Sequence, residues 1–495
     1  MGFLVNIPLF SIVLSLFSGA LCFLLPGKAA KRYTFCYELL LIAMLTALLC
    51  YVLKTGEAFT YVMGEFPAPW GNEIRAGVLE AVMALMFLLV MFCSVLAGHV
   101  FVDTDIDESK VNLYYALLNL MTAALMSLMF TNDLFTGYVF VEILTLTSCG
   151  ILIVRELGRT TLAAVRYMIL NLLGSGLFLL GVVLLYTMTG HLLMVPMQQT
   201  ILELSGNPEA MPTMIMAVGI VTIGLSIKSG LFPFHYWMPD TYGYATPSSA
   251  AILSSLVSKA YIFLLFKIYY RVVGISVFEQ MPIGHILLVL GICGIIAGSV
   301  SAIRSDHINR MTAFSSAAQI GYIYMGLGLG GIVGYTAAIF HIMVHAITKS
   351  QLFLTTPHLA EVSGGSLLFK ELQGSGRRDR DAGVFFTVSA LSMIGIPIFA
   401  GFSSKLQFGL AAVQAGNSVL IPVMLALAVS SMLNALYFMR TIIRIYAEDD
   451  REESRPHHGP DYILPMLVLT ACNLFLGLFS WVMTDLIRTG ISMFG

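Results

Sequence analysis

Two lysines lie on either side of a break in an apolar segment, where amino groups could take up and release protons. Lys228 lies inside an apolar run that is interrupted at Pro233 and Pro239, and Lys259 lies in the apolar run that starts near Pro247. A lysine at the centre of a membrane helix costs about 2.5–3.5 kcal/mol, and a proline inside a helix costs about 3 kcal/mol. Broken helices persist in membranes only where protein buries them or where they line a wet cavity. The pattern predicts an ion path; a re-entrant loop with two snorkelling lysines is the alternative.

Glu142 is a carboxylate in the middle of another apolar run, TGYVFVEILTLTSCGILIV. An isolated ionised carboxylate is strongly disfavoured there, so Glu142 must pair with a cation or take up a proton. Lys228 and Lys259 are the available partners. A lysine that alternates between a carboxylate and isolation changes its proton affinity, which is what a pump requires. A static ion pair that joins two helices is the alternative.

A third apolar run, IFHIMVHAITKSQLF, carries His341, His345 and Lys349 at a spacing of four residues. This spacing places all three on one helix face. Histidine titrates near neutral pH and can pass a proton through either ring nitrogen, so the stripe predicts a proton relay. Structural hydrogen bonding and metal binding are the alternatives. A metal is disfavoured because the acidic residue of an HExxH motif is missing and Lys349 would repel a cation.

Lys405 follows a second interrupted run, IGIPIFAGFSSK. Two Gly/Pro-broken segments at matching places point to a transport site between two repeats. Lys228 and Lys405 would then be equivalent lysines, one in each repeat. Glu80 and His235 are further candidates, His235 because it lies in the first break.

The composition indicates the elements that must hold these residues. The chain has 495 residues, of which 58% are hydrophobic and 11% charged, whereas a soluble domain has about 25% charged residues. The sequence therefore predicts an all-α polytopic membrane protein. About fourteen transmembrane helices are expected, and the positions of their ends are defined to within a few residues. They cover 4–25, 34–53, 77–99, 111–130, 134–154, 162–187, 212–231, 247–270, 284–303, 309–328, 331–356, 383–412, 418–442 and 462–487.

Helices seven and twelve of this series are the broken ones. Because they lie five spans apart, an odd number, the two repeats are expected to be five-helix units of inverted topology. The predicted organisation has four parts: three N-terminal spans in 1–110, a first repeat in 111–271, a second repeat in 284–446 and a final span in 462–495.

Loop charges predict the orientation. Lysines and arginines concentrate in the loops after spans one, five, nine, eleven and thirteen, and loops rich in these residues face the cytoplasm. Both termini should therefore lie on the outer side of the cell membrane. The residues are Lys28, Lys31, Arg32, Arg155, Arg159, Arg304, Arg310, Lys370, Arg377, Arg378, Arg380, Arg440, Arg444, Arg451 and Arg455.

Cofactors and nucleic acid are not expected. The seven cysteines form no CxxC or other cluster, so we predict no iron–sulfur, zinc or haem-attachment site, no bound cofactor and no metal. A net charge of −2 gives no indication of nucleic acid binding.

These motifs in this order resemble a known family. Glu142, the stretch KSGLFPFHYWMPDTYGYATPSSAAILSSLVSK, the HxxxHxxxK stripe and GIPxxxGFSSK resemble the antiporter-like subunits of respiratory complex I. They resemble more closely the D-type subunit of Mrp-type multisubunit Na+/H+ antiporters and its counterparts in membrane-bound hydrogenases. The resemblance covers nearly the whole chain. It implies a fourteen-helix fold with two inverted five-helix units and a polar axis across the membrane plane.

Roles for individual residues follow from the resemblance. It implies that Glu142 and Lys228 form a charge pair, that Lys259 lies between two half-channels, and that Lys405 is the terminal lysine. His341 and His345 match the family's relay in span eleven, and Glu80 falls where the family often has an acidic residue.

Three complex I subunit types fit less well. One type has a lysine in place of Glu142, and another has a glutamate in place of Lys405. The largest type adds a lateral helix after its last span, whereas this chain ends at Gly495. The D-like antiporter subunit is the remaining match.

The sequence thus predicts a proton-translocating subunit of a multisubunit cation/proton antiporter, with other membrane subunits, the lipid bilayer, protons and Na+ as partners. The alternative is the same subunit type in a redox-driven complex. No catalytic chemistry is expected of this chain alone. A membrane-embedded enzyme, a scaffold that has lost pumping and a carrier of organic solutes are rivals. The absence of cysteine motifs and the midplane lysines argue against the enzyme, and the full set of charges argues against the scaffold.

Overall fold

Long helices account for nearly all of the chain, because in a membrane a helix satisfies its own backbone hydrogen bonds. The computed structural model describes residues 2–66, 71–449 and 456–494; Arg451 and Arg455 of the predicted basic loops lie outside these residues. The first third contains α1 (Gly2–Val5), α2 (Ile7–Leu24), α3 (Gly27–Thr55), β1 (Phe59–Val62), η1 (Met63–Glu65), β2 (Glu73–Ala76), α4 (Val78–Asp105), η2 (Glu108–Lys110), α5 (Val111–Phe130), α6 (Leu134–Ile153) and α7 (Gly158–Thr189). β1 and β2 pair antiparallel, from Phe59 opposite Ala76 to Val62 opposite Glu73.

The middle and last parts of the chain continue in the same manner. The middle contains α8 (Met194–Leu204), α9 (Met211–Ser229), η3 (Phe234–Trp237), α10 (Met238–Tyr244), α11 (Pro247–Ile252), η4 (Leu253–Val257), α12 (Ser258–Lys267), η5 (Ile268–Val273), α13 (Ile275–Phe278), α14 (Ile283–Arg304) and α15 (Ile308–Leu329). The last part contains α16 (Gly331–Glu361), α17 (Ser375–Arg378), α18 (Arg380–Ile394), α19 (Ala400–Ala415), α20 (Asn417–Tyr446), α21 (Pro460–Leu478) and α22 (Ser480–Ser492).

The predicted membrane spans are present. Within the described residues, twelve helices are long and apolar enough to cross a membrane. Two further predicted spans correspond to α15, which is more polar, and to the pair α18 and α19, which is interrupted. The fold class, an all-helical polytopic membrane protein, is confirmed, with the β1–β2 hairpin as a small addition.

Both expected breaks occur where the sequence places glycine and proline. α9 ends at Gly230, whose φ is 78°, and α18 ends at Gly395, whose φ is 95°. Glycine adopts this left-handed conformation without a steric penalty, which makes it the usual helix terminator. A third irregularity was not predicted: the span from α11 to η5 contains two π-helical turns, η4 and η5.

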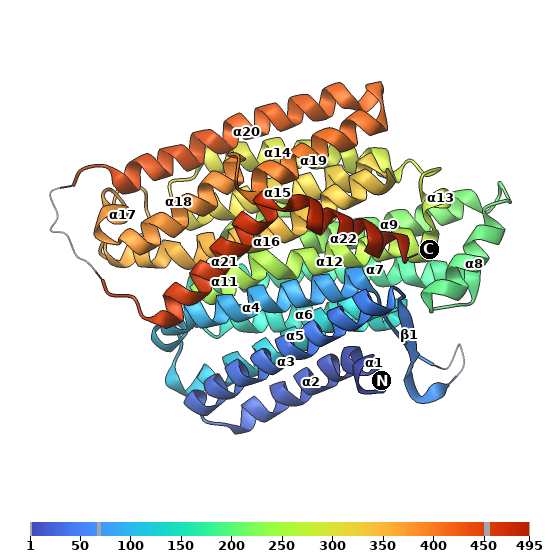
Figure 1. The fold of residues 1–495 in the computed structure, drawn as a ribbon, viewed down its shortest axis with the longest axis horizontal. Helices are drawn as coiled ribbons and strands as arrows, with labels where there is room; N and C mark the ends of the chain where they lie inside the picture. The colour runs from blue at the N-terminus through green and yellow to red at the C-terminus, as the bar shows by residue number, and fades with distance from the viewer. Residues whose placement is uncertain (1, 67–70, 450–455, 495) are drawn as a thin grey trace.

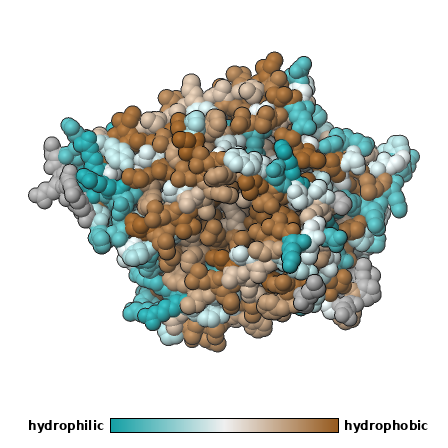
Figure 2. Space-filling model, viewed as in Figure 1, coloured by the Kyte–Doolittle hydropathy of each residue, from teal (hydrophilic) through white to brown (hydrophobic). Residues whose placement is uncertain are grey.

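The helices run roughly side by side, and the N- and C-termini lie toward the same end of the bundle (Figure 1). A chain that crosses the membrane an even number of times must have both termini on the same side. On the face drawn in Figure 2, a broad apolar band separates two polar ends, as expected for a protein surrounded by lipid. Which end faces the cytoplasm and where the two repeats begin and end remain predictions.

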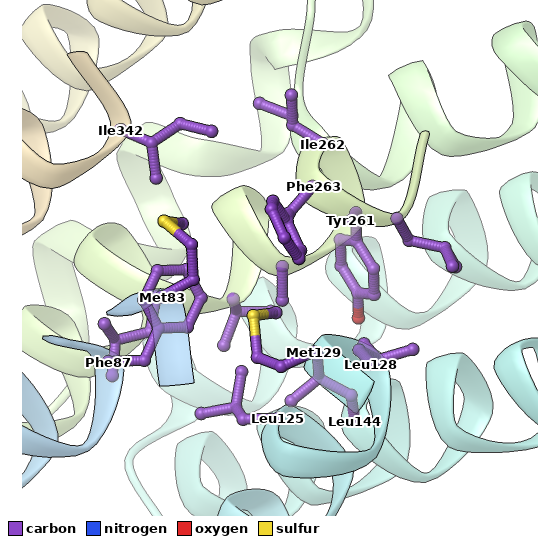
Figure 3. Packing of buried hydrophobic residues seen from close by; sticks show 14 of the residues in the cluster. Met83, Phe87, Leu125, Leu128, Met129, Leu144, Tyr261, Ile262, Phe263 and Ile342 are labelled. Atoms are coloured by element: carbon purple, nitrogen blue, oxygen red, sulfur yellow. The ribbon is translucent and has the colours of Figure 1, made fainter. Parts of the chain in front are cut away.

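The span from α11 to η5 forms the centre of the molecule. Its most apolar window is completely buried by protein. Figure 3 shows the packing beside it, where apolar side chains of α4, α5, α6, α12 and α16 meet. Glycines bring other helices close together: a Cβ at Gly224 of α9 would lie 2.6 Å from the Gly174 carbonyl oxygen of α7. Such small-residue contacts are typical of helix packing in membranes.

Candidate functional site

Lys228 is held against α6. It lies in the last turn of α9, is completely buried, and donates a hydrogen bond of 2.6 Å to Thr145 Oγ1. Its Nζ also lies 5.2 Å from the centre of the Tyr261 ring. Both contacts stabilise an ammonium group in an apolar interior.

Glu142 lies one turn before Thr145 on α6 and is half-buried. Residues three apart on a helix share a face, so the carboxylate and the hydroxyl are neighbouring positions for one ammonium group. Among the ion pairs of the described residues Glu142 has none, so the predicted charge pair is not a direct contact in the structure.

Lys259 occupies the centre of the bundle. Its side chain is completely buried and donates a hydrogen bond back to the carbonyl oxygen of Ser254, within the π turn η4. The Ser254 hydroxyl lies 2.9 Å from that of Ser316 on α15. The π turn therefore supplies a polar backbone atom to a lysine that has no carboxylate partner among the described residues.

Lys349 continues the polar line on α16. It is completely buried and donates hydrogen bonds to the Thr312 carbonyl oxygen, at 3.0 Å, and to Ser315 Oγ, at 2.8 Å. Tyr437 of α20 approaches the same Ser315 hydroxyl at 3.0 Å. The lysine is thus bonded to two oxygens of α15, one of which also accepts a hydrogen bond from Tyr437 of α20.

The two histidines connect Lys349 with α19. The His341 and His345 rings are stacked with their centres 6.1 Å apart. His341 Nδ1 lies 2.8 Å from Ser404 Oγ, whereas neither ring nitrogen of the fully buried His345 has a hydrogen-bond partner among the described residues. The stripe predicted on one face of this helix is therefore a buried polar line.

Lys405 ends this line. It follows Ser404 directly on α19 and donates hydrogen bonds to the Ile394 carbonyl oxygen, at 2.6 Å, and to Ser431 Oγ, at 3.0 Å. Ile394 is the last residue of α18, so the break between α18 and α19 leaves a free carbonyl that accepts the ammonium group.

We call the following set the lysine row: Glu142, Lys228, Lys259, Lys349, His345, His341 and Lys405. Hydroxyl groups fill the spaces along it. Ser229, next to Lys228, lies 2.7 Å from the Tyr324 hydroxyl, and Thr145, Ser254, Ser315, Ser404 and Ser431 each contact a member of the row or its backbone partner.

Glu80 and His235 lie outside the lysine row. Glu80 forms a buried ion pair with Arg75 and accepts a hydrogen bond from the Gly77 backbone at the start of α4, a structural capping role. Beside it, Lys267 and Arg271 donate to backbone carbonyls and Asn132. His235 is buried between the rings of Phe232 and Tyr236.

Sequence reasoning missed a second polar cluster and the hydroxyl partners Thr145, Ser315, Ser404 and Ser431. His358, Asp379 and His458 place one possible ligand atom each within 4.8 Å of the others. They come from three separate segments, so no local spacing could reveal them. Glu38, a carboxylate buried in α3 without a hydrogen-bond partner among the described residues, was signalled by its apolar surroundings and overlooked.

Comparison with known proteins places the chain in a family. Residues 131–432 match the family model described as NADH:quinone oxidoreductase/Mrp antiporter, TM. NADH-quinone oxidoreductase subunit N of Desulforudis audaxviator is 30% identical over 498 residues, covering 96% of each chain. The D-type subunit of the Na(+)/H(+) antiporter of Alkalihalophilus pseudofirmus is 26% identical over 422 residues, covering 84% of this chain and 82% of the relative.

Solved structures share the fold. A chain of the Mrp complex from Dietzia sp. DQ12-45-1b has a TM-score of 0.88 at 23% identity, covering 99% of this chain and 97% of that chain. A chain of the membrane-bound sulfane sulfur reductase, an archaeal respiratory membrane complex, has a TM-score of 0.87 at 25% identity, covering 100% and 97%. Both are parts of multisubunit assemblies. The resemblance seen in the motifs is confirmed: the chain belongs to the NADH:quinone oxidoreductase/Mrp antiporter family of transmembrane antiporter-like subunits.

Proposed function

We propose that this chain translocates protons along the lysine row as the D-type subunit of a multisubunit cation/proton antiporter. One observation carries the proposal: the buried lysines and histidines of α9, α12 and α16 and the half-buried Lys405 of α19 lie on helices that pack against one another across the bundle. Among the described residues, all of them except His345 are hydrogen-bonded to a hydroxyl or a backbone carbonyl. A lysine inside a membrane protein is costly to keep, so a row of them serves a function that packing alone does not require.

The charges of the row are not balanced. It contains four lysines and one carboxylate, and buried charges without partners cost several kcal/mol each, by the order of magnitude seen in proteins. Protonating one member therefore disfavours protonating its neighbours, so the sites titrate as a coupled set. Coupled sites of this kind can pass a proton along the row when a change in the protonation of one site alters the proton occupancy of its neighbour.

Lys228 is the switching element in this scheme. In the structure its ammonium group is bonded to Thr145, while the Glu142 carboxylate lies one turn away on the same helix. Movement between the two positions changes the proton affinity of Lys228 and, through repulsion, that of Lys259. Moving one charge across 100 mV requires about 2.3 kcal/mol, which is comparable to one strong hydrogen bond to a charged group.

The remaining roles follow from this scheme. Lys259 links the two halves of the row, Lys349, His345 and His341 relay protons along α16, and Lys405 connects the row to the surface. The scheme does not require Glu80 or His235. The exchanged cation is Na+, which crosses with the help of other membrane subunits of the complex. The two inverted five-helix repeats, and termini on the outer side, complete the proposal.

A redox-driven complex is the second candidate. It is favoured by the relative named NADH-quinone oxidoreductase subunit N, which aligns with nearly the whole chain, and by the similarity to a chain of the sulfane sulfur reductase complex. Affinity purification of the tagged chain from its own membranes distinguishes the two candidates: small membrane subunits alone indicate the antiporter, and soluble subunits containing iron–sulfur clusters indicate the redox complex.

Three variants test the role of Lys228 in the assembled complex. Lys228→Met removes the charge, and Lys228→Arg keeps a charge that cannot be released. Lys54→Met, at an exposed position of α3, is the control for the substitution itself. We expect both Lys228 variants to assemble and to lose proton-coupled transport in reconstituted vesicles, while Lys54→Met transports normally. Undiminished transport by an assembled Lys228→Met complex refutes the proposal.

A further inference from the structure

The His358–Asp379–His458 cluster lies away from the lysine row, at the end of the bundle where α16 ends and α18 and α21 begin. His358 lies in the last turn of α16, Asp379 is the N-cap residue of α18, and His458 lies two residues before α21. Figure 1 shows α18 and the start of α21 at the same end of the molecule. Three segments that are distant in the sequence therefore converge at one point.

The cluster has the composition of a metal site. His458 Nε2 lies 2.8 Å from Asp379 Oδ2, and the rings of His358 and His458 are 4.6 Å apart. Two imidazoles and one carboxylate are a common ligand set for Zn²⁺. Zinc bonds of about 2.1 Å in a tetrahedron place neighbouring ligand atoms about 3.4 Å apart. The three ligand atoms, all within 4.8 Å of one another, reach that spacing by small side-chain movements.

A second observation points to a ligand. His358 is more than nine-tenths buried, yet neither of its ring nitrogens has a hydrogen-bond partner among the described residues. Its Nδ1 lies 3.3 Å from Glu361 Oε2 without the alignment of a hydrogen bond. Buried imidazole nitrogens normally have partners, and a cation shared with Asp379 and His458 would provide one.

The surroundings of the cluster support the ligands. Asp379 Oδ1 accepts a hydrogen bond from the Ala382 backbone, which leaves Oδ2 directed at His458. The Tyr462 ring packs on both histidines, with ring centres 4.2 and 4.7 Å away. The neighbouring Arg378 is neutralised by an ion pair with Asp449, so its charge does not oppose a bound cation. Fixed outer contacts of this kind orient metal ligands.

We propose that His358, Asp379 and His458 bind a Zn²⁺ ion, with Glu361 or water as the fourth ligand. The bound ion ties the end of α16, which carries the histidines of the lysine row, to the start of the broken helix α18 and to α21. This site lies outside the proposed proton route and does not depend on it. It would clamp the ends of three helices that already pack against one another.

Zinc binding is measured on the purified complex after treatment with a chelator. Zn²⁺ is added back, free metal is removed by gel filtration, and bound zinc is counted by mass spectrometry. Co²⁺ replaces Zn²⁺ in a parallel sample, because the absorption of tetrahedral Co²⁺ reports nitrogen and oxygen ligands. The comparison between wild type and variants isolates this site from metals on other subunits.

The variants are chosen to keep the fold. His358→Gln and His458→Gln remove one ligand each. Asp379→Asn removes the charged ligand but keeps an N-cap for α18. His457→Gln changes the adjacent, exposed histidine and is the matched control. Thermal unfolding of each metal-free variant shows whether it is folded.

We expect wild type and His457→Gln to bind one more zinc per chain than the other variants do. The dissociation constant should rise at least about tenfold when a ligand is lost. Zinc should raise the unfolding temperature of wild type and of His457→Gln, and not that of the three ligand variants. Equal zinc content and equal Co²⁺ spectra in wild type and in the folded Asp379→Asn variant would overturn the proposal.

Discussion

Thr145→Val tests whether Lys228 uses the position seen in the structure. The bond from Lys228 Nζ to Thr145 Oγ1 is 2.6 Å long and buried, and a hydrogen bond to a charged group contributes about 1.5–3 kcal/mol. Valine has nearly the shape of threonine and no hydroxyl. The substitution should therefore shift the balance between the Thr145 and Glu142 positions by about 10- to 150-fold.

If the transport cycle requires the Lys228 ammonium group to occupy both the Thr145 and the Glu142 positions, the transport rate should fall by about tenfold or more at equal amounts of complex. The assay follows a pH-sensitive dye in inverted membrane vesicles after addition of Na+, with native gels to confirm assembly. If the complex is redox-driven, addition of its electron donor replaces Na+ as the trigger.

Thr147→Val is the matched control for this experiment. Thr147 lies on the same helix, is buried, and among the described residues donates only to the Ile143 and Leu144 carbonyls of its own helix. The Thr147→Val substitution should leave the transport rate within about twofold of wild type, because such local bonds to the helix backbone contribute little to stability. If Thr145→Val also transports at the wild-type rate, Lys228 does not rest on Thr145 during the cycle and the switching scheme fails.

Three further predictions follow from the structure. Gly224→Ala should destabilise the protein by about 1–3 kcal/mol, because its Cβ would meet backbone atoms of α7, whereas Gly219→Ala on the same helix meets nothing within 4 Å; thermal unfolding in detergent compares the two, and equal stability would contradict the close packing. His307 caps α15, and burial together with Arg310 lowers its pKa to about 4. Since an unfolded histidine titrates near 6.5, the unfolded state binds more protons between these values, so stability decreases as the pH is lowered through this window, by about 2 kcal/mol at most at pH 5. His307→Asn, which can still cap the helix, should lose less stability than wild type between pH 7.5 and pH 5; an equal loss would show that His307 is not responsible. His345→Leu should abolish transport without loss of assembly, because it interrupts the relay between Lys349 and His341, and normal transport would remove this residue from the route.

The fold was predictable because its signals are local. Runs of about twenty apolar residues identify the spans, and the sequence GLFPF and the sequence GIPIFAG each contain a glycine and a proline that cannot continue a helix. Charged residues inside apolar runs are equally easy to recognise, so all members of the lysine row could be identified from the sequence alone.

Other features depend on tertiary contacts and have no such signature. The segment LSSLV of η4 reads as ordinary helix, because a π turn differs from an α-helix only in which backbone groups pair. The preference of Lys228 for Thr145 over Glu142 depends on how α9 meets α6. The His358–Asp379–His458 cluster needs three distant segments to converge.

The π turn at Leu253–Val257 changes the phase of the central span. An α-helix turns by about 100° per residue, and a π turn accommodates roughly one extra residue without restarting the helix. Residues after Val257 therefore face about 100° away from where an uninterrupted helix would direct them. Deleting one residue from this segment would rotate the rest of the span, and with it both Lys259 and Lys267. Such a deletion should reduce transport more than most substitutions nearby. Conversely, inserting one residue as a π turn changes the direction of a buried lysine side chain without any change in the surrounding helices.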